Sequence, residues 1–102
     1  MSETTPQEIR RAIHRVEHPA IATSLADLGM LRDIEIAPSG EITLTLVLPF
    51  PQIPENVRDH LIHSLGAAVQ NAGGRLSRIR LAVMNEAERE KFLRKEKENW
   101  RG

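Results

Sequence analysis

The sequence predicts an α+β domain of two layers, in which two helices pack on a three-stranded mixed sheet and a charged C-terminal helix follows. Two segments carry apolar residues with the period of a helix, and three carry them with the period of a strand. A length of 102 residues is that of one domain, which we take to span residues 1–102. The predicted order is helix, strand, strand, helix, strand, helix.

The first helix is predicted to begin after Thr5. Pro6 at the first helical position and Glu8 three residues after the cap are typical of a capping box. Because His18 precedes Pro19, which disfavours the helical region, we expect the helix to end there. Its apolar stripe consists of Ile9, Ala12, Ile13 and Val16.

A short capped turn and a β-hairpin follow. In "TSLADLGML", Ser24 can cap the turn and Gly29 can close it in the left-handed conformation. Residues 31–48 predict the hairpin, in which "APSG" places Pro38 and Gly40 at positions that a turn favours. Its buried face is predicted from alternating apolar residues: Ile34, Ile36, Ile42, Leu44, Leu46 and Leu48.

The longest helix and a third strand complete the two layers. From Ile53 to Ala72, apolar residues line one helical face over five turns. The stretch "LSRIRLAV" then predicts a strand whose Ile79, Leu81 and Val83 lie on the face that the helices cover. Since a right-handed crossover joins parallel strands, we place this strand beside one strand of the hairpin.

The opposite face of the sheet is predicted to be open or lightly covered, because threonines and arginines occupy it. On this face Arg78 and Arg80 could bind a phosphate or a partner. We favour ion pairs with Asp33 and Glu35 across the strands.

A charged helix is predicted over about residues 86–100. Asn85 can cap it, and Glu88 stands at the capping-box position. Its apolar residues are few, so the sequence indicates a solvated helix that could also serve as a docking element.

Composition excludes several classes of function. Lysine plus arginine and aspartate plus glutamate each number 14, so no net field recruits nucleic acid or an anionic membrane. The chain has no cysteine, which excludes disulfides and thiolate-held clusters. Neither a membrane span nor an apolar signal-peptide core is found, so we expect a cytoplasmic protein with neither nucleic acid nor membrane as a partner.

Three prolines stiffen the stretch "LPFPQIPENV" between the second strand and the longest helix: Pro49, Pro51 and Pro54. Pro54 suits the first turn of that helix, where its missing N–H is not needed. Two interpretations are open. The prolines only shape a tight corner, or the stiff loop is the functional surface, beside the free N–H groups of the helix start.

Two segments, "VEHPAIATSLADLGMLRDIEI" and "ITLTLVLPFPQIPENVRDHLIHSLGAAV", resemble the small iron–sulfur assembly accessory domains of the SufT-like and PaaD-like family. The resemblance covers roughly Ile9 to Met84 and is greatest to the domain at the N-terminus of Mrp/ApbC-type P-loop ATPases. Its most specific piece is "LADLGML", because the family typically has an Asp-Leu-Gly turn before its first strand. It implies a non-enzymatic accessory domain without a cofactor of its own, whose partner is a P-loop ATPase scaffold or an iron–sulfur client protein.

The turn and the proline loop are expected to lie side by side at one end of the hairpin and to face the partner. The residues of this site are Asp27, Gly29, Phe50, Pro51, Ile53 and Pro54. Family members often have Asp-Pro-Glu near the first helix, where this chain has residues 18–20, His-Pro-Ala. They often have a cysteine before the loop proline, where this chain has Ile53. Both missing groups are candidate metal or cluster ligands in the family.

Asp27 could act as a general base. Its position three residues after Ser24 is that of a capping-box carboxylate bonded back to the cap, and we favour this structural role. The chain has no recognisable nucleophile motif and no Gly-rich phosphate loop.

Two alternative functions remain: a histidine-based metal-binding module, and a small-ligand domain with the proline loop as its pocket rim. His60 and His63 have a spacing that metal ligands use on a helix. Both lie away from the leucine stripe, so we interpret them as solvated. His14 and His18 lie at the end of the first helix, where a histidine is electrostatically favourable without binding a metal, and we favour this interpretation.

Overall fold

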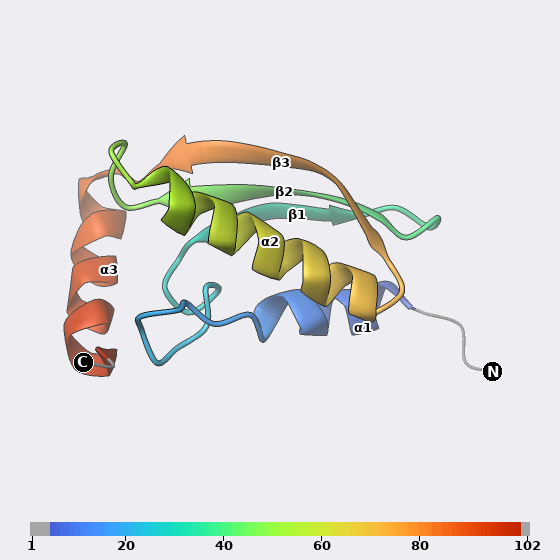
Figure 1. The fold of residues 1–102 in the computed structure, drawn as a ribbon, viewed down its shortest axis with the longest axis horizontal. Coiled ribbons are helices and arrows are strands. Elements are labelled where there is room, and N and C mark those ends of the chain that lie inside the picture. Colours follow the sequence, from blue (N-terminus) through green and yellow to red (C-terminus); the bar gives the residue numbers. More distant parts are fainter. Residues whose placement is uncertain (1–4, 101–102) are drawn as a thin grey trace.

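The computed structural model describes residues 5–100 and confirms the predicted fold (Figure 1). Residues 1–4 and 101–102 of the predicted domain lie outside this part. The elements are α1 (Pro6–His14), β1 (Leu31–Ile36), β2 (Glu41–Leu48), α2 (Glu55–Asn71), β3 (Arg75–Val83) and α3 (Glu86–Asn99). No helix in the described part is long and apolar enough to cross a membrane.

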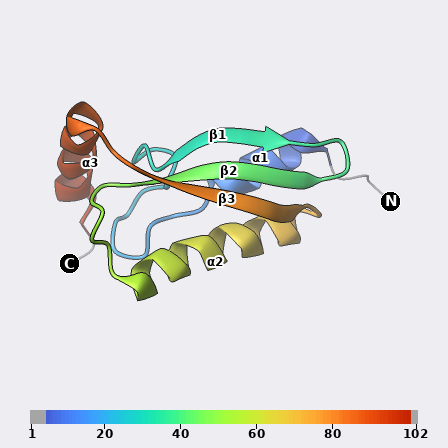
Figure 2. The ribbon, with the colours of Figure 1, turned by 90° about the horizontal axis from the view of Figure 1, so that it is seen from above.

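The sheet has the order β1-β2-β3, with β1 antiparallel and β3 parallel to the middle strand. Helices α1 and α2 lie on one face of it, and α3 stands across one end of both layers (Figures 1 and 2). The core lies between the sheet and the helices. Its largest fully buried side chains include Ile9, Ile13, Ile42, Leu44, Leu46, Leu61, Leu65 and Val69.

Helix α1 ends at His14 and not near His18, which the sequence predicted. The chain folds back on itself instead, since the Val16 carbonyl accepts a hydrogen bond from the Leu25 N–H at 2.8 Å. This pairing replaces the last helical turn while Val16 remains buried. His18 therefore does not share a helix with His14, and its Nδ1 accepts the N–H of Ala20 at 3.0 Å.

Helix α2 begins at Glu55, and Pro54 is its N-cap. Pro54 has an extended ψ of 141°, so it stands one position before the first helical turn in which the sequence placed it. Its carbonyl accepts hydrogen bonds from the N–H groups of Val57 and Arg58 at 3.1 and 3.0 Å. The proline therefore contributes an acceptor to the helix start, where its missing donor has no cost.

The apolar residues of β3 face the predicted side but are not all covered. Leu81 is level with Leu46 and Val83 with Leu48, two core residues of the middle strand. Yet Leu81 is 50% exposed and Val83 46% exposed. β3 is an edge strand, and α2 draws away from it toward the proline loop, so no helix lies over its last residues (Figure 2).

The predicted ion pairs of Arg78 and Arg80 with Asp33 and Glu35 are not formed within residues 5–100. The middle strand β2 separates β1 from β3, and two strand spacings amount to about 9.5 Å. Asp33 stands at a β-bulge and has a φ of 54°. Its Oδ2 lies 3.9 Å from Nε of the neighbouring Arg32 instead. Both arginines of β3 are left exposed on the open face.

The apolar stripe of α2 predicts that substitutions at two nearby residues will have very different effects on the free energy of unfolding. Leu61 is 1% exposed, and Leu61→Ala should lower the free energy of unfolding by about 2–5 kcal/mol, because truncation leaves a cavity. His63 is exposed, and His63→Ala should change it by no more than about 0.5 kcal/mol. Denaturant titrations of the two variants measure both values. A large loss for His63→Ala would reveal a partner for the imidazole.

Candidate functional site

The two segments of the predicted site lie at the same end of the sheet. The proline loop, residues 49–54, follows β2, and the Asp-Leu-Gly turn, residues 24–30, precedes β1. The N–H of Val47 donates to the carbonyl of Met30 at 2.8 Å where the two strands end. Helix α3 stands at this end of the layers, near both segments (Figure 1).

The local geometry of the Asp-Leu-Gly turn is the predicted one. The hydroxyl of Ser24 accepts the N–H of Asp27 at 3.1 Å, so Ser24 caps the turn. Gly29 has a φ of 76°, in the left-handed region. A Cβ added there would meet nothing within 4 Å, so the backbone conformation, not lack of space, favours glycine.

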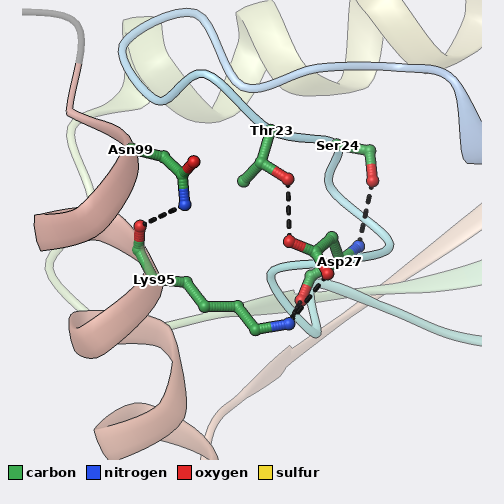
Figure 3. A network of polar contacts seen from close by, with 5 residues as sticks. All are labelled: Thr23, Ser24, Asp27, Lys95 and Asn99. Atoms are coloured by element: carbon green, nitrogen blue, oxygen red, sulfur yellow. Dashed lines mark hydrogen bonds and ion pairs between the residues drawn. The ribbon is translucent and has the colours of Figure 1, made fainter.

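The carboxylate of Asp27 does not bond back to Ser24, contrary to the prediction. It accepts the hydroxyl of Thr23 at 2.7 Å and the ammonium of Lys95 at 2.8 Å (Figure 3). The ammonium also donates to the Asp27 carbonyl at 2.8 Å. A charged donor gives a stronger bond than the backbone N–H of a cap, so the contact with α3 prevails.

These donors fix the protonation state of Asp27. The hydrogen bond from Lys95 lowers the pKa of this carboxyl below its ordinary value, and the bond from Thr23 lowers it further. A carboxylate held in its ionised form is a weak base. The geometry therefore gives Asp27 the structural role of joining the turn to α3.

Nearer the start of α3, Arg89 contacts the proline loop. Its Nε donates to the carbonyl of Pro49 at 2.7 Å, and its Nη2 donates to the carbonyl of Met84 at 3.0 Å. Its guanidinium also lies over the ring of Phe50, 5.2 Å from the centroid. Pro49 is buried by this arrangement, whereas Phe50 and Pro51 stay exposed.

Helix α3 is exposed over much of its surface, as its composition indicated, and one face of it packs against the domain. The predicted capping box of Asn85 begins it, and Phe92, at 3% exposure, lies in the core. The carbonyl of Asn99 accepts the N–H of Ala22 at 2.7 Å and fastens its last turn. Four contacting residues of α3 are Arg89, Phe92, Lys95 and Asn99, whose steps of three, three and four are those of one helical face; beside this face, Glu88 pairs with Arg32 of β1 at 3.6 Å. This spacing was the signal by which the sequence could have revealed them.

The two segments are linked through α3. Arg89 and Lys95 are six residues apart, which is about 9 Å along the helix, so each segment contacts its own part of α3. Within residues 5–100, no hydrogen bond or ion pair joins residues 49–54 to residues 24–30 directly. The two segments lie at the same end of the sheet, as the sequence predicted. The sequence did not predict that α3 would link them.

The far half of the proline loop borders a different feature. Half-buried Ile53 packs against the core, and exposed Pro51 lies beside it. Both line an open hollow of about 200 Å³, together with Leu81 and Val83 at the end of β3. Ligand pockets measure roughly 300–1,000 Å³, so this hollow is small for the rim of a small-molecule site.

No donor set suited to a metal or an iron–sulfur cluster is found in the described part of the chain. His60 and His63 are exposed on α2. Residues 5–100 contain no group of three or more histidine, cysteine, aspartate or glutamate side chains placed to hold a metal ion. The sequence has no cysteine, the residue that holds most clusters. The side chains present do not fit a resident cluster.

The contact between Asp27 and Lys95 predicts a measurable titration. A carboxyl with a lowered pKa contributes stability above its unfolded pKa, and this contribution is lost as the pH falls through the lowered value. We expect the Asp27 carboxyl carbon to titrate below the range of an ordinary aspartate in NMR spectra. Lys95→Met should raise its midpoint, and Thr23→Val should raise it less. Equal midpoints in the native protein and in Lys95→Met would contradict the contact.

Comparisons with known proteins agree with this architecture. The family described as iron–sulfur cluster assembly protein matches residues 6–74, from α1 through α2. An iron–sulfur cluster carrier protein from Synechocystis sp. is 29% identical over 89 residues, which are 87% of this chain. The chain spans only 24% of the length of that relative.

A solved structure shares the fold. It is the crystal structure of a domain of unknown function, DUF59, from Bacillus anthracis, with a TM-score of 0.50 and 14% identity. The likeness covers 76% of this chain and 72% of that one. With a family match that extends over two helices, the Asp-Leu-Gly turn, the hairpin and the proline loop, the chain belongs to the iron–sulfur cluster assembly protein family.

Proposed function

We propose that this chain is a non-enzymatic accessory domain of iron–sulfur cluster assembly and that it acts through protein contacts. Its partner would be a P-loop ATPase scaffold or an iron–sulfur client protein. Membership of the family supports the process, and the named function of the Synechocystis relative, a cluster carrier, agrees with it. Because this chain has no cysteine, the thiolate ligands of a transferred cluster would belong to the partner.

The observation that carries this proposal is the exposure of large apolar side chains beside engaged charged groups at the α3 end of the sheet. The three charged groups that border the turn and the proline loop are engaged within the domain: Asp27 with Lys95, and Arg89 with two backbone carbonyls. The large apolar side chains of Phe50 and Leu93 are each 41% exposed. Leu93 lies one turn along α3 from Arg89, on which Phe50 stacks.

Such an arrangement suits an interface better than a catalytic centre. An exposed aromatic side chain on a loop stiffened by prolines presents contact area at a small cost in conformational entropy. Aromatic residues are also enriched among the residues that dominate binding energy. Phe50 and Pro51 are therefore the residues that we expect to contact the partner.

A double variant of the proline loop tests this role. Phe50→Ala with Pro51→Ala should weaken binding to a P-loop ATPase scaffold by about tenfold or more, since a central aromatic anchor contributes about 1.4 kcal/mol or more. The free energy of unfolding should fall by about 1–2 kcal/mol, because the variant loses an exposed cation–π contact and its unfolded chain gains freedom without Pro51. Calorimetric titration and thermal melting measure the two quantities.

His14→Ala, an exposed change on α1, is the matched control and should leave binding unchanged. If the double variant binds as well as the native chain while its stability falls, the proline loop is only a structural corner.

Reconstitution with iron and sulfide tests the absence of a resident cluster. We expect the purified chain to be colourless and to retain no stoichiometric iron or sulfide after anaerobic reconstitution and desalting, because it offers no thiolate. Metal analysis and the visible absorption spectrum provide the measurement. A charge-transfer band with matching iron and sulfide would mean that the chain holds a cluster by itself.

A further inference from the structure

The outer edge of β3 is free for pairing. β3 is nine residues long and has β2 on one side only. The N–H of Met84 donates to the carbonyl of Leu48 at 2.8 Å. Because successive residues of a strand direct their backbone groups to opposite sides, the N–H and C=O groups of Val83 and Leu81 lie on the outer edge. Within residues 5–100, no backbone hydrogen bond joins this edge to another element.

Natural edge strands are commonly protected against pairing by prolines, charged side chains, bulges or short length. β3 contains no proline, its register shift lies near its start, and its charged residues are all arginines, which repel a basic strand but not an acidic one. Its second half is therefore a regular strand with unpaired backbone groups. Such an edge is a template for an added strand.

Two open hollows lie along this edge of β3. One of about 600 Å³ lies between α2 and the start of β3, and includes Ile62, Gly66 and Leu76. The other is the hollow of about 200 Å³ at the end of β3, which the proline loop and Arg58 of α2 border. We call the two hollows together the β3 groove. Helix α2 draws away from β3 toward the proline loop (Figure 2).

Gly66 has no side chain, so α2 leaves open space in the β3 groove at this position. A Cβ added at Gly66 would come no closer than 4.0 Å to any heavy atom, and that atom belongs to Leu76. The helix therefore tolerates a side chain at this position, although it carries none. The space beside β3 is open for side chains that an added strand would direct toward α2.

The two faces of β3 present different chemistry to an added strand. Toward the helical layer stand the exposed side chains of Leu81 and Val83. Toward the open face stand Arg78 and Arg80, whose side chains make no hydrogen bond or ion pair within residues 5–100. Neighbouring strands place their side chains in facing pairs, and successive residues alternate between faces. A complementary strand would alternate apolar and acidic residues.

A second copy of this chain does not have that complementarity. In antiparallel registers that overlap most of β3, Arg78 or Arg80 of one copy lies opposite or diagonal to an arginine of the other. Like charges that face each other across strands are destabilising. Charge complementarity therefore favours an acidic partner over self-association.

We propose that the β3 groove binds an extended segment of a partner protein, in which apolar and acidic residues alternate, as a fourth strand of the sheet. Backbone hydrogen bonds to the edge of β3 supply affinity. Leu81 and Val83 on one face, and Arg78 and Arg80 on the other, select the sequence. This site goes beyond the proposed function, since it requires neither a cluster nor an ATPase.

Two labelled peptides test the proposal by fluorescence anisotropy: eight residues that alternate valine with glutamate, and eight that alternate valine with lysine. The native chain should bind the glutamate peptide at least about tenfold more tightly, because two arginines face its acidic side. Bound glutamate peptide should also slow the hydrogen exchange of the Leu81 and Val83 amides.

Three variants assign the binding to the β3 groove. Gly66→Leu should lower the affinity for the glutamate peptide about tenfold by filling the groove. Arg78→Glu with Arg80→Glu should reverse the preference toward the lysine peptide. Arg10→Glu is the matched control, an exposed arginine of α1 without an ion pair in the described part of the chain, and should change nothing.

Circular dichroism checks that each variant is folded. If Gly66→Leu does not fold, the variant Arg78→Glu with Arg80→Glu tests whether the peptide binds in the β3 groove. The proposal is overturned by equal affinity for the two peptides, by no binding at millimolar concentration, or by unchanged exchange at Leu81 and Val83. Concentration-dependent dimerisation through β3 would overturn it as well. None of these outcomes bears on the proposed function, because the peptides contain no cluster and no ATPase.

Discussion

The fold depends on the closure of one end of its core by α3. Two helices on a three-stranded sheet leave the layer open where β2 ends and β1 begins. Phe92 enters the core from α3 and is almost fully buried. Arg89 and Lys95, on the same face of that helix, bind the carbonyl of Pro49 and the carboxylate of Asp27. One buried ring and two cations thus hold a helix that is otherwise polar.

That closure also determines what the α3 end of the sheet can do. Arg89 and Lys95, the two cations of α3 that contact the proline loop and the Asp-Leu-Gly turn, are engaged there. The carboxylate that could act as a base is kept ionised by its hydrogen bonds, and its pKa is lowered. Beside the exposed charged residues of α3, this end presents the apolar surface of Phe50, Pro51 and Leu93 to the solvent. A surface of this kind serves recognition better than chemistry.

The two proposed contact surfaces are continuous through the proline loop. Its first half joins α3 through Arg89, and its second half, with Pro51 and Ile53, borders the end of β3. A partner could therefore contact the end of the sheet and place an extended segment along its edge. A chain without cysteine would contribute to cluster assembly in this way by holding proteins together, while other chains supply the thiolates.

The sequence by itself determined the element order, the caps at Thr5, Ser24 and Asn85, and the left-handed Gly29. These features depend on a few neighbouring residues, and local patterns report them well. It also indicated that the loop and the turn share one end of the hairpin, since antiparallel strands require it.

The tertiary structure decided the rest. In place of the last predicted turn of α1, Val16 pairs with Leu25. The carboxylate of Asp27 contacts Lys95, 68 residues away. The tertiary structure also placed β2 between the charges of β1 and β3, and left Leu81 uncovered at an edge. Periodicity shows which face of an element a residue occupies, but not which element covers that face, because coverage depends on how the layers are displaced relative to one another.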